Sequence, residues 1–386
     1  MTKNTIDLGR RRVTQGLGLL TAGLMLSGSG FVEMAFAAQP EYYPKDYASV
    51  IEASKAEHGV LVYSNMGEMN WAPLIQAFNA EYPWIKVQTL DLGSSEVFDR
   101  YYAETAAGTN QTDVVVSHSA ASWLDFIQKK GGVNTDFVSA EADKLPAYSK
   151  PSPGIYTISV DPYFIVYNKA LISPEEAPKS IQDIVDLVTK DPARFAHKVA
   201  TGVPMANAAA QNLSNTYIQH VGVDKALQQY TALGDAVDVY RSAGQIMEKI
   251  TTGEVLIGFM LSGIQVFPLL ADPARAQILG YAFPTDGTVM LMRHIAMAKT
   301  VKNPNSAKLF IDFVLSAAGQ TALSAGGLMS YRDDVVLPDG PTGYTYKKIE
   351  TEAGASSLVP TTFDAKTMIP PQDLIDKVNA ALHVQP

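Results

Sequence analysis

The fold follows from one stretch of sequence: residues 240–267 read YRSAGQIMEKITTGEVLIGFMLSGIQVF. The first half predicts a helix capped by Ser242, and the second predicts a buried strand at Val255–Met260. In open α/β sheets, ligands bind outside the carboxyl ends of such strands. We therefore expect residues from both ends of this unit to face one cleft: Arg241, Ser242 and Gly244 before the helix, and Ser262 and Gly263 after the strand. An ordinary capped helix and a strand-to-helix loop are the alternative interpretation.

The composition limits the class of protein. The chain has 386 residues, 47% of them hydrophobic, which is enough for two domains of common size. Its net charge of −9 argues against nucleic acid or an anionic membrane as the main partner. It contains no cysteine, so a disulfide, a thiol nucleophile and a thiolate metal site are excluded.

The first residues predict an export signal. Arg10–Arg12 precede a mildly apolar run over residues 13–31, and the tripeptide AFA at 35–37 fits a cleavage site. We expect cleavage near Ala37/Ala38 and a mature protein in the periplasm. The consecutive arginines resemble a twin-arginine signal, whereas the two residues after them do not, so export by the general route stays open. A transmembrane anchor is the alternative, and the Gly and Ser content of the run disfavours it.

Strands and helices alternate through residues 59–130, which predicts a parallel sheet with right-handed crossovers. Three predicted strands end in small polar residues before a helix: Ser64-Asn65, Ser94-Ser95 and Ser117–Ser119. Their hydroxyls, amides and backbone N–H groups would point toward one anionic or polar ligand. Each segment also suits a helix N-cap, which is the structural alternative.

Two long predicted strands cross between the halves of the chain, at residues 154–168 and 289–298. Arg293 lies in the second of them among apolar residues, MLMRHIAM, where a charge needs a partner. We interpret Arg293 as a ligand-binding group or, alternatively, as half of a salt bridge between lobes. After these strands, residues 337–360 are predicted to be rich in loops, and residues 372–382 to form a final helix.

Six segments resemble one known family. They are GVLVYSN at 59–65, TDVVVS at 112–117, PYFIVYNKALI at 162–172, GVPMANAAAQ at 202–211, TTGEVLIGF at 251–259 and AKTVKNPNSAKLFIDFVLSAAGQ at 298–320. The pattern is similar to the periplasmic solute-binding proteins of ABC importers, in the branch that contains ferric-ion, hexose-phosphate, aminoethylphosphonate and thiamine binders. The resemblance covers residues 59–331. The last segment is the most specific, since this family commonly places an NP-x-x-A-x-x-F-x-x-F-x-x-S helix after its return strand.

The resemblance implies an α/β protein with the two-lobed periplasmic-binding-protein type II fold. Each lobe would hold a mixed, mainly parallel sheet with flanking helices, and two crossing strands would join the lobes. After a signal at 1–37, the expected boundaries are 38–158 with 288–335 for lobe 1, 159–287 for lobe 2, and 336–386 for a C-terminal segment that docks on both. The resemblance also implies closure on a ligand by hinge motion, and docking on an inner-membrane permease with a cytoplasmic ATPase. We expect a monomer with no cofactor and no nucleic-acid partner.

One departure from the family pattern narrows the choice of ligand. The resemblance implies that a ferric-ion binder carries two adjacent tyrosines shortly after the GEV-x-x-G strand, but this chain has LSGIQ there, at residues 261–265. Hard Fe(III) prefers anionic oxygen ligands, and the pairs Tyr42-Tyr43 and Tyr101-Tyr102 do not match that position. His118 has no His or carboxylate at metal-ligand spacing. We therefore predict no metal site and keep ferric ion as an alternative ligand.

The predicted site combines neutral donors with two cations. Arg241 and Arg293 would each bind a carboxylate or phosphate, and Tyr163 would stack on a ring or sugar face. Trp71 is expected in the core. The resemblance places a helix start that can hold an anion at Asn207-Ala208. The full predicted set is Ser64, Asn65, Ser94, Ser95, Ser119, Tyr163, Asn207, Ala208, Arg241, Ser242, Ser262, Gly263 and Arg293.

These observations together predict a non-enzymatic periplasmic receptor of an ABC transporter. Its ligand would be a small organic anion, phosphorylated or carboxylated. A ferric-ion-binding protein of an iron importer is the first alternative. An exported hydrolase is the second, and it is disfavoured because the sequence has neither G-x-S-x-G nor H-E-x-x-H.

Overall fold

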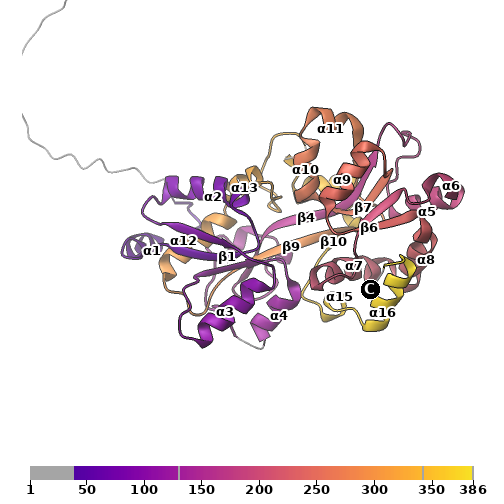
Figure 1. Cartoon of the computed structure of the whole chain (residues 1–386). Helices are drawn as coiled ribbons and strands as arrows, with labels where there is room; N and C mark the ends of the chain where they lie inside the picture. Colours follow the sequence, from indigo (N-terminus) through magenta and orange to yellow (C-terminus); the bar gives the residue numbers. More distant parts are fainter. Residues whose placement is uncertain (1–38, 129–130, 341–342, 385–386) are drawn as a thin grey trace, which may run out of the picture. The chain divides into compact units, whose positions relative to one another are not determined.

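One mixed sheet organises the protein (Figure 1). The computed structural model describes residues 39–128, 131–340 and 343–384, so the predicted export signal and its cleavage site lie outside the described residues. Within those ranges the sheet has 10 strands in the order β2-β1-β3-β9-β4-β7-β5-β6, with β10 beside β9 and β8 beside β4. This mixed α/β arrangement confirms the predicted two-lobed fold.

The first lobe is built on three parallel strands. They are β1 (Val60–Ser64), β2 (Val87–Asp91) and β3 (Val114–Ser117). Trp71, Phe78 and Phe310 are fully buried in its core, as the sequence predicted for Trp71. The helices of this lobe are α1 (Tyr47–Ser54), α2 (Glu68–Glu81), α3 (Glu96–Ala106), α4 (Ala120–Gln128), α12 (Pro304–Leu315) and α13 (Ala317–Ala325), with short 3₁₀ turns at Ala142–Lys144 and Ala147–Ser149.

The second lobe repeats this plan with three further parallel strands, β5 (Val199–Gly202), β6 (Val237–Tyr240) and β7 (Ile257–Ser262). The short strand β8 (Leu279–Ala282) pairs with β4. A 3₁₀ turn at Gly234–Ala236 leads into β6. The helices are α5 (Ile181–Lys190), α6 (Pro192–Phe195), α7 (Ala208–Val221), α8 (Val223–Leu233), α9 (Ala243–Thr252), α10 (Gly263–Leu270) and α11 (Pro273–Ile278).

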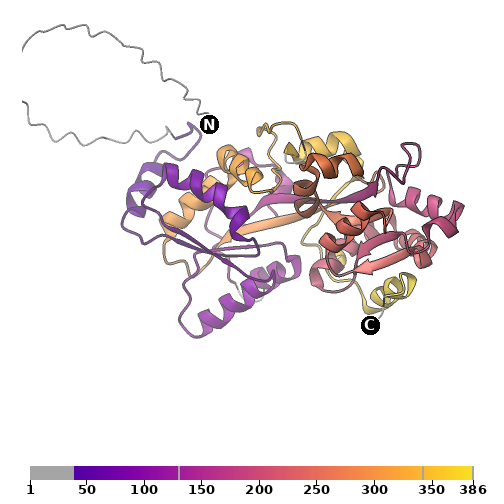
Figure 2. The same ribbon diagram turned by 45° about the horizontal axis from the view of Figure 1, so that its top comes forward.

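Two crossing strands, β4 (Ile155–Asn168) and β9 (Thr288–Met297), belong to both lobes. They pair with each other in antiparallel register, Ser159 opposite Arg293 and Tyr163 opposite Val289. Strand β9 also pairs with β3, and β4 also pairs with β7. The sheet is therefore continuous through the crossing strands, which run side by side in Figure 2 between the indigo and the red parts of the chain.

The opening stretch of the sequence folds largely as its pattern predicts. Ser242 Oγ accepts a hydrogen bond from Gln245 N (3.3 Å) at the start of α9. Gly253 ends that helix with a φ of 78°, a left-handed conformation that favours glycine. One difference follows β7, because Gly263 begins α10 at once where the sequence suggested a loop.

The C-terminal segment contains more regular structure than its loop-rich sequence suggests. It holds α14 (Tyr346–Ala353), a 3₁₀ turn at Ala355–Ser357, β10 (Leu358–Pro360), α15 (Ala365–Met368) and α16 (Gln372–Ala381). Strand β10 adds to the edge of β9 in parallel, and Asn215 Nδ2 on α7 donates to the carbonyl of Lys366 (2.7 Å). These tertiary contacts order elements that are too short to predict from local pattern.

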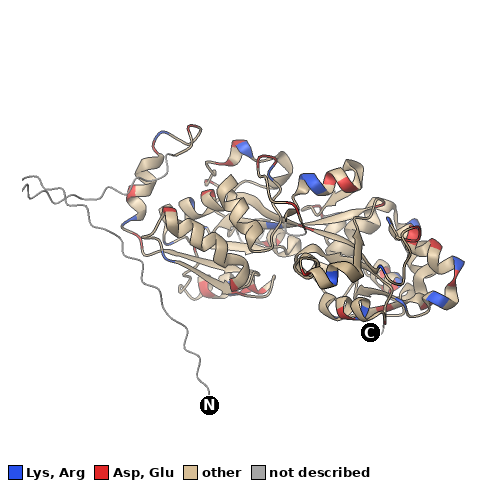
Figure 3. Cartoon of the chain, turned by 90° about the horizontal axis from the view of Figure 1, so that it is seen from above, with Lys and Arg blue, Asp and Glu red and all other residues tan. Residues whose placement is uncertain are grey.

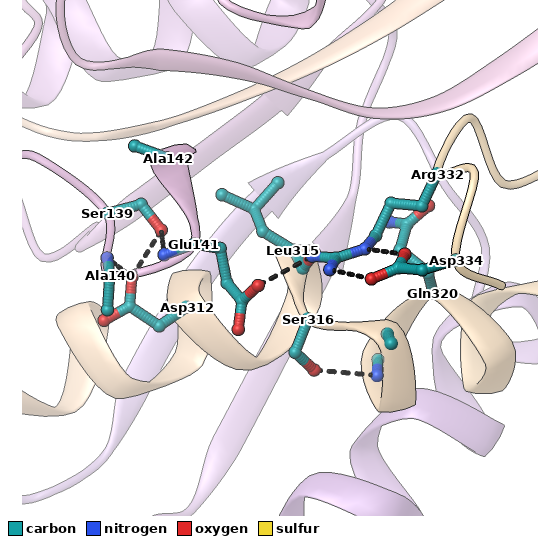
Figure 4. Close-up of polar contacts among 12 residues, drawn as sticks. Ser139, Ala140, Glu141, Ala142, Asp312, Leu315, Ser316, Gln320, Arg332 and Asp334 are labelled. Atoms are coloured by element: carbon teal, nitrogen blue, oxygen red, sulfur yellow. Dashed lines mark hydrogen bonds and ion pairs between the residues drawn. The ribbon is translucent and has the colours of Figure 1, made fainter. Parts of the chain in front are cut away.

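A buried network of ion pairs and hydrogen bonds links segments of the first lobe (Figure 4). Arg332 donates from Nη1 to Glu141 Oε2 (2.7 Å) and from Nη2 to Asp334 Oδ2 (2.6 Å), and the Arg332 and Glu141 side chains are 1% and 0% exposed. Beside it, Asp312 on α12 accepts from Ser139 Oγ (2.6 Å). Burial raises the pKa of Asp312 to about 6. The network joins α12 to the segments around residues 140 and 333.

Charged residues lie mainly on the helices and loops around the sheet (Figure 3). Among the residues that the structure describes, none of the helices is both long and apolar enough to cross a membrane.

Candidate functional site

A pocket of about 890 Å³ opens in the second lobe where three parallel strands end. The last residues of β5, β6 and β7, which are Gly202, Tyr240 and Ser262, all line it. The helices α7, α9 and α10 begin directly after these strands or after a short loop. The pocket therefore lies at the sheet edge where α/β folds bind ligands, and its volume falls within the usual range for small-molecule sites, about 300–1,000 Å³.

Two helix starts bring polar groups to the pocket. Asn207 caps α7, its Oδ1 accepting from Ala209 N and Ala210 N, both at 3.1 Å. Its amide nitrogen takes part in none of the hydrogen bonds within the described residues, so it stays available as a donor. Ser242 caps α9 beside the exposed guanidinium of Arg241. Together these groups present donors and the partial positive charge of helix N-termini to the pocket.

The third helix start is occupied by the chain itself. Asp161 on β4 accepts from Ile264 N (3.0 Å) at Oδ1 and from Ser262 Oγ (2.5 Å) at Oδ2, and so caps α10. The residue is 5% exposed, and burial raises the pKa of its carboxyl to about 6, although these hydrogen bonds and Arg293 oppose the shift. Sequence reasoning did not single out Asp161. The signal was a carboxylate inside an otherwise apolar strand, ISVDPYFIV.

Arg293 lies at the junction of the lobes on β9. Its Nη1 donates to Asn65 Oδ1 (2.5 Å), and Asn65 Nδ2 lies 2.6 Å from Nδ1 of His118. The residue is 8% exposed, its Nε is buried without a partner, and none of the ion pairs within the described chain includes it. Burial lowers the pKa of Arg293, which Asp161 and Tyr163 oppose. The pKa of His118 is lowered to about 3 by burial and by the Arg293 charge, so this histidine is neutral at pH 7.

The serine-rich strand ends of the first lobe come together with one another. Ser117 Oγ donates to Ser94 O (2.7 Å), and Ser122 links the hydroxyls of Ser119 (2.8 Å) and Ser95 (3.3 Å). Ser64 Oγ accepts from Trp71 Nε1 (2.9 Å) inside the core. In this conformation most of these hydroxyls serve the lobe's own structure.

The predicted residues thus fall into two groups. Those that line the pocket are Tyr163, Asn207, Arg241, Ser242 and Ser262. Those outside its lining are Ser64, Asn65, Ser94, Ser95, Ser119, Ala208, Gly263 and Arg293. Arg293 nevertheless acts electrostatically on Tyr163, which belongs to the pocket. Tyr240 and Met260 line the pocket but were not predicted as site residues.

The two tyrosine pairs of the sequence lie away from this pocket. Tyr42 and Tyr43 both donate to Glu141 Oε1, at 3.0 and 2.7 Å, and Tyr101 is buried in the first lobe. Within residues 39–128, 131–340 and 343–384, no three or more His, Asp or Glu side chains are grouped to hold a metal ion.

A continuous sheet shared by two lobes, with a pocket at its strand ends, is an arrangement in which α/β proteins bind small ligands. Residues 73–349 match the model of the bacterial extracellular solute-binding protein family, and the chain belongs to that family. Proteins of this class bind small ligands and work with ABC permeases, and the family's members are transport proteins rather than enzymes. An uncharacterized protein of Haemophilus influenzae is 22% identical over 314 residues, which cover 78% of this chain and 86% of that protein.

Solved structures show the same fold. A substrate-binding protein of an ABC transporter from Agrobacterium tumefaciens has a TM-score of 0.67 and 22% identity, covering 85% of this chain and 96% of its own. AfuA from Actinobacillus pleuropneumoniae, with fructose-6-phosphate bound, has a TM-score of 0.62 and 18% identity, and the match covers 85% of this chain and 99% of AfuA. A Trichodesmium protein in complex with iron and citrate has a TM-score of 0.63 and 18% identity, and the match covers 84% of this chain and 99% of that chain.

Proposed function

We propose that this protein is the periplasmic receptor of an ABC importer for a small organic anion. The anion binds in the cleft between the lobes and is delivered to an inner-membrane permease with a cytoplasmic ATPase. The lobes correspond to residues 38–158 with 288–335 and to 159–287. They close by hinge motion about β4 and β9, with 336–386 as a docked segment. The receptor is exported by the signal at 1–37 and acts as a monomer without enzymatic activity.

The observation that carries this proposal is Arg293. A guanidinium that is 8% exposed and forms no ion pair within the described residues costs free energy, because a buried charge is normally paired. Its Nε is a buried donor that has no acceptor in the described part of the chain, and an anionic ligand would supply one. Arg241 and the α7 and α9 helix starts add positive potential at the pocket, whose lining residue Tyr163 also feels the Arg293 charge. All of these features favour an anion over a neutral solute.

The test is calorimetric titration of the mature protein with organic anions, each beside a neutral analogue, for example a carboxylate beside its amide. We expect binding of an anion at least tenfold tighter than of its amide, and loss of that preference in Arg293→Gln. Arg275→Gln, which removes the same charge on α11 outside the pocket, should bind like the unchanged protein. Equal binding of acid and amide would overturn the proposal. Binding of ferric citrate alone, with a coloured complex, would instead identify the ferric alternative.

A further inference from the structure

The pocket changes character along its length. Arg241, Asn207, Ser242 and Ser262 lie at strand ends and helix starts and form what is here called the polar end. Several apolar members lie further back along the same elements, since Val239 and Phe259 are inside β6 and β7 and Leu213 is in the second turn of α7. Val203 and Pro204 add apolar surface in the loop before α7, and these side chains together with Met260 are here called the groove. The other polar members, Thr201, Ser214, Tyr230 and His383, stand elsewhere in the lining.

The backbone at Met260 supports a binding role for the groove. Strands β4 and β7 pair through Phe164 with Leu261 and through Val166 with Gly258, so Phe259 and Met260 together stand opposite Ile165 alone. This is a β-bulge, a feature that redirects side chains and is common next to functional sites. Met260 has a φ of 54°, which a residue other than glycine adopts only at a cost in energy, and its half-buried side chain lines the pocket.

The charges at the polar end indicate the head group. Among the described residues that line the pocket, Arg241 is the one Lys or Arg, and none is Asp or Glu. The lining therefore offers one fixed positive charge, which complements a monoanion better than a dianionic phosphate ester.

We propose that the pocket binds a monocarboxylate with an apolar body, the carboxylate at the Arg241 end and the body in the groove beside Met260. This inference rests on the proposed function and names its class of ligand. Methionine suits the role, because its flexible, polarizable thioether packs well against alkyl chains and aromatic rings.

The first experiment titrates the mature protein with a series of straight-chain carboxylates of increasing length: acetate, butyrate and hexanoate. Each buried methylene should tighten binding about fourfold, so hexanoate should bind about two orders of magnitude tighter than acetate. 3-Phenylpropionate should bind at least as tightly as butyrate, whereas fructose 6-phosphate should bind more weakly than hexanoate.

The second experiment changes the groove through Met260→Asn. Asparagine tolerates a positive φ, so we expect the melting temperature to stay the same or rise. Hexanoate should then bind at least tenfold more weakly, with acetate changed less than threefold. The matched control is His197→Asn, because His197 also has a positive φ (57°) but is exposed and lies outside the pocket. That variant should keep hexanoate affinity.

Gly202→Leu gives an independent check. A Cβ at Gly202 would meet nothing within 4 Å, so a larger side chain can enter the pocket and should weaken hexanoate more than acetate.

The outcomes separate the two proposals. Equal affinity for acetate and hexanoate, or tighter binding of fructose 6-phosphate than of any carboxylate, would overturn the inference while the receptor for organic anions stands. Binding of neutral solutes or ferric ion without any organic anion would overturn both.

Discussion

Ser159 and Arg293 lie opposite each other on the crossing strands β4 and β9, and each holds a buried polar atom that has no hydrogen-bond partner within the described chain, Ser159 Oγ and Arg293 Nε. Most buried polar groups in folded proteins are hydrogen-bonded, so two unpaired atoms on adjacent strands require an explanation. Their position at the junction of the lobes offers one, since a ligand held between the lobes would reach them there.

Replacing Arg293 with Gln should separate stability from binding. At pH 5, below the raised pKa of Asp161, that carboxyl is largely neutral and does not depend on the guanidinium. The ligand-free variant should then unfold within about 1 kcal/mol of the unchanged protein or be more stable, because a buried cation without a counter-ion is removed. Urea unfolding checks this. A loss of several kcal/mol would show that Arg293 is mainly structural.

Asn207→Asp should weaken anion binding without weakening α7. Aspartate caps a helix about as well as asparagine, so stability should change by less than about 0.5 kcal/mol. The new negative charge at the pocket should lower anion affinity roughly tenfold at low salt, and less in 1 M salt, because salt screens exposed charges. Titration at two ionic strengths measures both effects. Unchanged affinity would place the anion away from the α7 start.

Breaking the buried ion pair of the first lobe should lower the free energy of unfolding substantially. Arg332→Met leaves Glu141 without its partner at a side chain that is 0% exposed, and should destabilise the protein by about 3–5 kcal/mol. Lys377→Met removes an exposed pair with Asp373, whose side chains are 61% and 68% exposed, and should cost less than about 1 kcal/mol. Chemical unfolding of both variants gives the comparison. Similar losses would mean that the Arg332 network is not a major source of stability.

Asp312 should make stability fall as pH rises from about 4 to 6. Burial raises the pKa of this carboxyl in the folded state from its ordinary value of 3.8 to about 6, so in this window the native state binds more protons than the unfolded state. The favourable contribution is complete below pH 4 and is lost through pH 6, by about 3 kcal/mol at most. In Asp312→Asn this part of the slope should disappear. Melting temperatures from pH 4 to 7 test it, and an unchanged slope would exclude Asp312 as its source.

Local signals were sufficient for much of the fold. The N-cap at Ser242 and the NP-x-x-A helix now seen as α12 were both predicted, because caps and short motifs act within a few residues. Strand β6 has four residues at the end of the sheet order, and β10 has three residues beside β9. Neither was predicted, since segments so short are strands only because a neighbouring strand pairs with them.

The candidate site was predictable where it follows chain order. The strand-end rule predicted Arg241, Ser242 and Ser262 as cleft residues, the family resemblance predicted Asn207, and all four line the pocket. The role of Asp161 could not be predicted in this way, because it caps a helix through Ile264, which lies 103 positions further along the chain. The β-bulge at Met260 could not be predicted from the sequence either, since the φ of Met260 depends on the pairing of β7 with β4.

By itself, the sequence determined the alternation of strands and helices, the two crossing strands and the family pattern. These features depend on periodicity, caps and motifs, which involve residues close together in the chain. Only the tertiary structure decided which polar groups stay unpaired. Several serine hydroxyls of the first lobe bond to one another, Asp161 occupies the start of α10, and Arg293 keeps a buried Nε that has no hydrogen-bond partner among the described residues. The physical reason is that hydrogen-bond satisfaction depends on distances between segments far apart in the chain.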